Sequence, residues 1–303
     1  LEEAGKTLTP SPLFSTGVLG ASLLTLGGSD QQKQTYLPQI VDGTVTTALA
    51  LEESNRHAPH SIETVAKKSG DNFIISGTKN FVIDGHSSKL LIVAARTEGE
   101  KNDASGITLF LVESDHQDVE ITKTSMVDSR NAANIKFNDV AVSSENIIGE
   151  ENNGASVLEV VLDRAQIAIS AEMLGNASQA FDLTLEYLKE RKQFGAVIGT
   201  FQALQHRAAE MYSELELTKS SVIAACNAVD QNSNDLRRMA SLAKFKSGET
   251  NHLITNEAIQ MHGGVGVTDE YDVGLFMKRA RVTEQIFGNS EYHIDRYATL
   301  SDY

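Results

Sequence analysis

The stretch that decides the fold reads Glu190-Arg-Lys-Gln-Phe-Gly-Ala-Val-Ile-Gly-Thr-Phe-Gln-Ala-Leu-Gln-His-Arg207. Apolar residues recur at helical spacing on both sides of it, which predicts the junction between two long helices. A guanidinium such as that of Arg191 can bind a diphosphate through two parallel hydrogen bonds, and an amide such as that of Gln202 can contact a nucleotide. Taken alone, the stretch is also compatible with a solvated helix end and a polar helix face.

A second motif, Gln260-Met-His-Gly-Gly-Val-Gly266, follows at the end of the next helix. Gly263 is expected to end that helix, and the glycines together allow a ligand to approach the backbone closely. His262 is accompanied by no His-x-x-x-His or Cys/His cluster, so no metal is expected.

Three regions extend outward from these motifs. Residues 1–43 predict the remainder of an N-terminal helical domain, with Ser29 and Asp30 as N-caps of a short helix that ends before Pro38. Residues 44–148 contain short β-branched segments separated by Gly, Asp, Asn and Ser, which predict an all-β barrel or sandwich. Residues 149–303 predict an antiparallel four-helix bundle. The fold class is therefore α+β with several domains.

The same pattern predicts two local features, one in the β region and one in the helical region. In the β region, Phe73–Ser76 and Phe81–Ile83 are predicted as separate strands with Gly77-Thr-Lys-Asn80 between them. In the helical region, Cys226 lies in an apolar run and is predicted to be a buried small hydrophobe.

The composition bounds the partners. The chain of 303 residues has a net charge of −15, which disfavours nucleic acid and anionic membrane surfaces. No run approaches the roughly 18 apolar residues of a membrane span, and the first residues are not expected to be a signal peptide. One cysteine excludes an internal disulfide, so a cytoplasmic location is expected.

Together the two motifs resemble the acyl-CoA dehydrogenase family, and the resemblance covers the whole chain. Gly28-Ser-Asp-Gln-Gln-Lys-Gln-Thr-Tyr-Leu-Pro38 and Gly77-Thr-Lys-Asn-Phe-Val-Ile-Asp-Gly85 carry it into the first two regions. The resemblance implies a helical domain, a β domain and a helical bundle. The first domain is expected to be present only in part.

The resemblance also implies FAD as cofactor, an acyl-CoA as substrate and electron-transferring flavoprotein as acceptor. In this family the bundle of one subunit completes the FAD site of its neighbour, which implies an oligomer, most simply a tetramer. The residues carried over to the adenine-diphosphate half of the cofactor are Arg191, Gln193, Phe194, Gln202, Gln260, Gly263 and Gly264.

The flavin-ring half departs from the family pattern. The family's Thr-Glu-Pro-Gly-Ala-Gly-Ser-Asp reads Leu51-Glu-Glu-Ser-Asn-Arg-His-Ala58 here. The family's Trp-Ile-Thr or Trp-Ile-Ser reads Phe81-Val-Ile83, so a hydroxyl that would bond the flavin is lost.

The catalytic base is absent from both positions that the family uses. α-Proton abstraction needs a carboxylate, but these positions hold Phe287 or Gly288 and Ala165. Glu284 and Glu291 lie nearby, and each is better explained as a solvated helix charge. The catalytic residue is therefore left unassigned.

Three functional hypotheses follow. The chain resembles the small subunit of pimeloyl-CoA dehydrogenase-like heteromeric enzymes, in which a related chain keeps the base. A self-sufficient homo-oligomeric dehydrogenase with a displaced base is the second hypothesis. A catalytically inactive flavin-binding or scaffold relative is the third.

Overall fold

A computed structural model describes all 303 residues, and the chain forms two compact units. One consists of Ser11–Ala165, and the other combines Leu1–Pro10 with Gln166–Tyr303. The helix α4 (Gly154–Glu190) contains residues of both.

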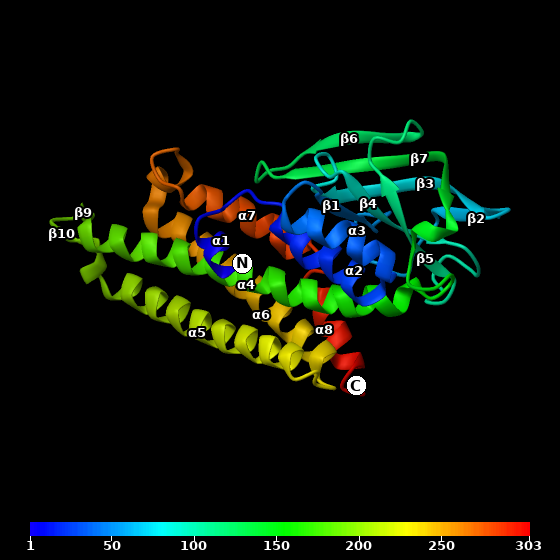
Figure 1. Cartoon of the computed structure of the whole chain (residues 1–303). Coiled ribbons are helices and arrows are strands. Elements are labelled where there is room, and N and C mark those ends of the chain that lie inside the picture. The colour runs from blue at the N-terminus through cyan, green and yellow to red at the C-terminus, as the bar shows by residue number, and fades with distance from the viewer. The chain divides into compact units, whose positions relative to one another are not determined.

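The unit Ser11–Ala165 contains an eight-stranded sheet (Figure 1). Its strands are β1 (Thr47–Ala50), β2 (Val65–Ser69), β3 (Asn72–Ile83), β4 (Leu90–Arg96), β5 (Ile107–Glu113), β6 (Val119–Ser125), β7 (Asn131–Ser143) and β8 (Ile147–Ile148). They pair in the order β6-β7-β3-β2-β4-β5-β8, and β1 pairs with β4 in parallel. Every residue of β4 is buried, which explains why its sequence is a continuous apolar run rather than an alternating one.

The prediction of two strands within residues 73–83 is wrong. β3 runs unbroken from Asn72 to Ile83 and pairs with β7 along its length. The register shifts between Ile75 and Gly77 and again between Lys79 and Val82, so bulges absorb the residues that resemble a turn. Gly77 is required there because a Cβ would lie 2.4 Å from the Thr64 hydroxyl oxygen.

The N-terminal part of the same unit contains η1 (Leu13–Gly20), α2 (Ala21–Gly27) and α3 (Asp30–Val41). Ser29 forms a capping box with Gln32, which confirms the predicted start of α3. The predicted end before Pro38 is wrong, since the helix includes that proline. The Gln32 amide donates to the backbone carbonyls of Glu145 and Ile147, which anchors the first turn of α3 to residues 145–147.

The helical unit is built from α4, α5 (Gln202–Asp230), α6 (Leu236–His262), α7 (Val273–Gln285) and α8 (Ser290–Thr299), with α1 (Glu2–Lys6) against them. Long helices lie side by side around one apolar core, as Figure 1 shows for α5 and α6. The sequence pattern predicted four helices in this region and did not predict α8. No helix has the length and apolar character needed to cross a membrane.

Cys226 corrects another prediction, because it is exposed on α5. Its neighbours in the apolar run face both ways, since Val222 and Ala225 are buried and Ile223 is half exposed. The helix pattern was therefore real, but the cysteine was assigned to the wrong face.

Two glycines fix the contact between α1 and α4. A Cβ at Gly175 would lie 1.9 Å from the backbone oxygen of Glu2, and a Cβ at Gly5 would lie 2.1 Å from that of Glu172. We expect Gly175→Ala to lower the free energy of unfolding by about 1–3 kcal/mol, because the backbone must move apart. Chemical denaturation measures the change, and proteolysis reports release of residues 1–10.

Gly248→Ala is the matched control in α6. A Cβ there meets only the Ser290 hydroxyl at 3.4 Å and a methionine methyl at 3.7 Å, which are ordinary contacts. Because alanine favours helix, this variant should be neutral or more stable by up to about 1 kcal/mol. Equal effects of both substitutions would contradict a close α1–α4 contact.

Candidate functional site: the hairpin between α4 and α5

A short hairpin joins α4 to α5. Its strands β9 (Lys192–Gln193) and β10 (Ala196–Val197) are antiparallel, and Phe194 and Gly195 form the turn with φ of 54° and 79°. Positive φ at both central residues is the geometry of a two-residue hairpin, but it is uncommon for phenylalanine. The turn exposes 92% of Phe194, so a large apolar ring is held out from the chain.

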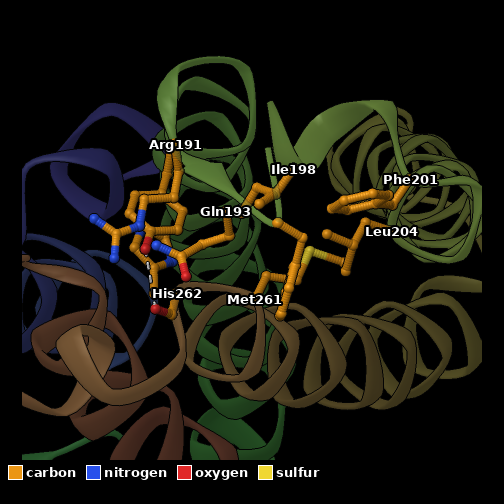
Figure 2. A pocket seen from close by; sticks show the side chains of 9 residues that line it. Arg191, Gln193, Ile198, Phe201, Leu204, Met261 and His262 are labelled. Atoms are coloured by element: carbon orange, nitrogen blue, oxygen red, sulfur yellow. Dashed lines mark hydrogen bonds between the residues drawn. The ribbon is translucent and has the colours of Figure 1, made fainter. Parts of the chain in front are cut away.

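A cavity of about 330 Å³ lies behind this hairpin (Figure 2). Arg191 and Gln193 supply polar groups, and Figure 2 shows their side chains on the same side of the cavity as His262. The remaining lining residues are Tyr187, Phe194, Ile198, Phe201, Leu204 and Met261. This volume is at the lower end of the range of small-molecule sites, which extends from about 300 to 1,000 Å³.

All seven residues that the resemblance assigns to the nucleotide lie exposed around the hairpin and the end of α6. Arg191, Gln193 and Phe194 line the cavity, whereas Gln202, Gln260, Gly263 and Gly264 lie outside its lining. The cavity residues that the sequence did not single out are mostly apolar. Tyr187 could have been found, since it precedes Arg191 by four residues and therefore shares its helix face.

Four of the polar side chains of this region, those of Arg191, Gln193, Gln202 and Gln260, have no partners within the chain. The guanidinium of Arg191 forms no ion pair or hydrogen bond, although the partly exposed Arg238 and the exposed Lys189 each pair with a nearby carboxylate. The side-chain amides of Gln193, Gln202 and Gln260 are likewise unpaired within the chain. Donors and acceptors gathered at one place without partners are available to a ligand or a second chain.

Gly263 and Gly264, which follow α6, are explained by different requirements. Gly263 has φ of 66° and accommodates the end of the helix, which confirms the predicted C-cap. Gly264 has an ordinary φ, and a Cβ there would meet nothing within 4 Å. The fold of this chain therefore does not require glycine at 264, whereas close approach by a molecule from outside would.

His262 is buried at the base of the cavity, with 4% of its surface exposed. Its ring stacks on Tyr187 with centroids 4.2 Å apart, and the ring edge of Tyr271 lies 5.0 Å away. Nδ1 lies 2.7 Å from the carbonyl oxygen of Ala258, and the Tyr187 hydroxyl donates to the backbone oxygen of His262. Burial lowers the pKa of His262, so the imidazole is neutral near pH 7.

The position of the missing base is a tightly held turn. Phe287 is buried with φ of 55°, and its carbonyl oxygen lies 3.0 Å from His293 Nε2 and 3.5 Å from the amide nitrogen of Gln166. The Lys244 ammonium donates to the carbonyl oxygens of Gly288 and Glu284. Burial lowers the pKa of Lys244 to about 7, opposed by the charge of Glu284. Side chains thus hold this turn by its backbone, and none of them is a carboxylate.

The two nearby carboxylates are differently engaged. Glu284 Oε2 lies 3.5 Å from His252 Nδ1 and 3.7 Å from an Arg281 nitrogen. Glu291 is exposed in the first turn of α8, where a negative charge is favoured by the helix dipole. Ala165, at the second base position, is fully buried. Each glutamate therefore has a structural explanation that involves no proton transfer.

The segment that departs most from the family pattern is well ordered by its own side chains. Glu53 occupies the place of the family proline, accepts hydrogen bonds from the backbone of Glu63 and Thr64, and pairs with the buried Lys79 at 2.6 Å. Glu52 accepts at 2.5 Å from Nδ1 of His57, whose side chain is 2% exposed. Glu53 therefore fastens the loop to β3, and Glu52 closes the loop on itself.

Phe81 occupies the place of the family tryptophan. The second bulge of β3 gives it φ of 56° and leaves 39% of its surface exposed, while the backbone N–H bonds to the Asn134 side chain. Ile83 ends the strand and carries no hydroxyl, as the sequence predicted. An aromatic face is thus retained in this unit, but the hydrogen-bonding group beside it is not.

Comparison with known proteins agrees with this geometry. The middle-domain model of acyl-CoA dehydrogenases matches residues 48–140, and the C-terminal-domain model matches residues 152–299. The probable acyl-CoA dehydrogenase YngJ of Bacillus subtilis (strain 168) is 34% identical over 96% of this chain and 78% of its own length. The mitochondrial short/branched chain specific acyl-CoA dehydrogenase of Bos taurus is 31% identical, and the chain spans 63% of that protein.

Solved structures agree as well. Butyryl-CoA dehydrogenase from Megasphaera elsdenii superposes with a TM-score of 0.92 at 29% identity, over 99% of this chain and 79% of that one. A variant of the steroid ACAD Tcur3481-Tcur3483 superposes with a TM-score of 0.88 at 29% identity, over 99% and 79% of the two chains.

The chain therefore belongs to the acyl-CoA dehydrogenase family, whose members are FAD-dependent oxidoreductases. Its α+β fold, with helical domains and a central β domain, is the family fold.

Proposed function

We propose that this chain is a subunit of an FAD-dependent acyl-CoA dehydrogenase that works with a related chain carrying the catalytic base. The observation that carries the proposal is the contrast between the hairpin region and the two positions where the family carries its base. The residues around the hairpin match the family and are free for a ligand, whereas the base positions hold Phe287 and Ala165. One solved relative carries a double name, Tcur3481-Tcur3483, which supports a two-chain arrangement here.

The residues around the cavity fit the adenine-diphosphate half of FAD. Arg191 supplies an unpaired, exposed guanidinium that suits a diphosphate, and the amides of Gln193 and Gln202 suit a sugar or base edge. The apolar wall formed by Ile198 and Phe201 suits one face of a purine. The open space at Gly264 permits a phosphate or sugar to approach the backbone.

FAD, when bound, supplies the hydride acceptor for oxidation of an acyl-CoA at its α and β carbons. This chain's own residues would bind and orient the nucleotide end and exclude water from it. They would not remove the α-proton, because Phe287 has no ionisable group and its turn is held by Gln166, His293 and Lys244. Electron-transferring flavoprotein is the proposed acceptor, in line with the family.

Co-expression tests the proposal. The chain is produced alone and together with a candidate acyl-CoA dehydrogenase-like partner chain that has the glutamate. We expect a yellow complex that reduces a dye in the presence of an acyl-CoA, and no such reduction by the chain alone. A colourless, inactive mixture would count against the subunit proposal and favour a scaffold role.

The competing function is a self-sufficient homo-oligomer in which Glu284 or Glu291 acts as the base. We expect Glu284→Gln and Glu291→Gln to leave acyl-CoA-dependent dye reduction by the two-chain complex within about twofold of the unmodified complex, because changes of surface charge alter local interactions only slightly. Loss of activity in either variant, with retained flavin and unchanged melting temperature, would identify that glutamate as the base.

A further inference from the structure

His262 has a fixed tautomer. Its Nδ1 lies 2.7 Å from the carbonyl oxygen of Ala258, and a carbonyl only accepts hydrogen bonds, so Nδ1 carries the proton. In the neutral ring Nε2 is then a bare acceptor. This atom is buried and has no hydrogen-bond partner in the chain.

An unpaired buried acceptor is unusual and costs free energy. The nearest rings do not satisfy it: Tyr187 stacks on the imidazole face, and the hydroxyl of Tyr187 is used by the backbone oxygen of His262. The ring of Tyr271 lies at 62° to the imidazole and forms no hydrogen bond with it. The partner must therefore come from outside the chain.

We propose that His262 recognises the nucleoside part of the ligand in this cavity, by accepting a hydrogen bond at Nε2 from an adenine amine or a ribose hydroxyl. This rests on the proposed nucleotide-binding function and extends it to a residue that discriminates between nucleosides. Phosphate oxygens only accept, so a neutral imidazole protonated at Nδ1 does not bind them through Nε2. Arg191 and His262, which line the same cavity, would thus bind opposite ends of the nucleotide and fix its direction.

Recognition of a ligand by His262 would require a neighbouring side chain to move. Its ring lies against both Tyr187 and His262, with centroids 5.3 Å and 5.0 Å away. Nε2 is buried, so a donor reaches it only after a neighbouring side chain moves, and we expect that side chain to be the partly exposed Tyr271.

Nucleotide binding by the full-length chain tests the inference. Isothermal titration is carried out with ADP, with IDP, which lacks the amine, and with 2′-deoxy-ADP and 3′-deoxy-ADP, which each lack one ribose hydroxyl. His262→Phe keeps a ring to stack on Tyr187 but has no acceptor, and His262→Gln restores an acceptor oxygen. We expect His262→Phe to weaken ADP binding by roughly threefold to tenfold, the range of one neutral hydrogen bond, and His262→Gln to recover part of it.

The analogues identify the donor. The analogue that lacks it should bind the unmodified chain more weakly than ADP does, and that difference should vanish in His262→Phe. If His262→Phe, with unchanged melting temperature, binds every nucleotide as the unmodified chain does, the inference is wrong while nucleotide binding stands. If ADP does not bind the unmodified chain, both the inference and the proposed nucleotide-binding role are wrong.

Discussion

Replacing Glu53 with glutamine is expected to lower the free energy of unfolding by about 3–5 kcal/mol near pH 7, because it leaves the Lys79 ammonium buried without its countercharge. Lys79 is fully buried, and its nitrogen lies 2.6 Å from Glu53 and 3.0 Å from the carbonyl oxygen of Leu51. Two backbone N–H groups, of Glu63 and Thr64, lose a charged acceptor in the same variant. Urea denaturation followed by circular dichroism measures the loss.

The loss of stability caused by Glu53→Gln should decrease as the pH rises. Burial lowers the pKa of Lys79 from 10.5 to about 8, although Glu53 opposes the shift. In the unmodified chain the unfolded state therefore binds more protons than the folded state between about pH 8 and 10.5, and the contribution of Lys79 to stability rises with pH there. Once Lys79 is neutral, the pair has little attraction left to lose. The cost of Glu53→Gln should accordingly be smaller at pH 9.5 than at pH 7.

Glu63→Gln provides the matched control. Glu63 pairs with Lys101 on the surface, where both side chains are at least half exposed, so its loss should cost less than about 1 kcal/mol. An equally small effect of Glu53→Gln would show that the buried pair does not stabilise the β domain.

Replacing Arg191 with alanine is expected to weaken binding of ADP by roughly tenfold to a hundredfold, which corresponds to the loss of about 1.5–3 kcal/mol from hydrogen bonds between charged groups. Arg191 forms no ion pair within the chain, so the substitution should leave the melting temperature unchanged. Isothermal titration of the full-length chain with ADP measures the affinity, and flavin absorbance measures FAD retained by the two-chain complex.

Arg238→Ala is the control for this variant. Arg238 is also on the surface of the helical unit, but it pairs with Asp235 at the beginning of α6, roughly 36 Å along the helix from His262. It should leave ADP affinity unchanged. Equal ADP affinity of Arg191→Ala and the unmodified chain would remove the main support for a nucleotide site at the hairpin.

The sequence predicted the order of the regions and the helices of the bundle because their apolar residues recur at regular spacing. It did not predict that β3 continues through Gly77, since a bulge and a turn use the same residues and only the pairing with β7 distinguishes them. It placed the end of α3 before Pro38 because proline commonly ends a helix, whereas α3 continues to Val41.

The candidate site, like the fold, could be predicted only in part. The polar residues of the hairpin could be identified from motifs, because Arg191 and Gln193 stand in a recognisable order. The apolar wall could not, since Ile198 and Met261 come from segments about 60 positions apart and resemble ordinary core residues. The role of Glu53 was also hidden: its position looked only like a lost proline, and the partner Lys79 lies on another strand.

Anaerobic titration of the flavin absorbance with a series of acyl-CoA thioesters tests most directly whether this chain lacks a catalytic base of its own. The chain reconstituted alone with FAD is compared with the complex that contains the partner chain. We expect acyl-CoA to bleach the flavin of the complex and to leave the flavin of the isolated chain oxidised, because Phe287 and Ala165 cannot accept the α-proton. Stoichiometric bleaching of the isolated chain would contradict this expectation and would show that this chain carries its own base.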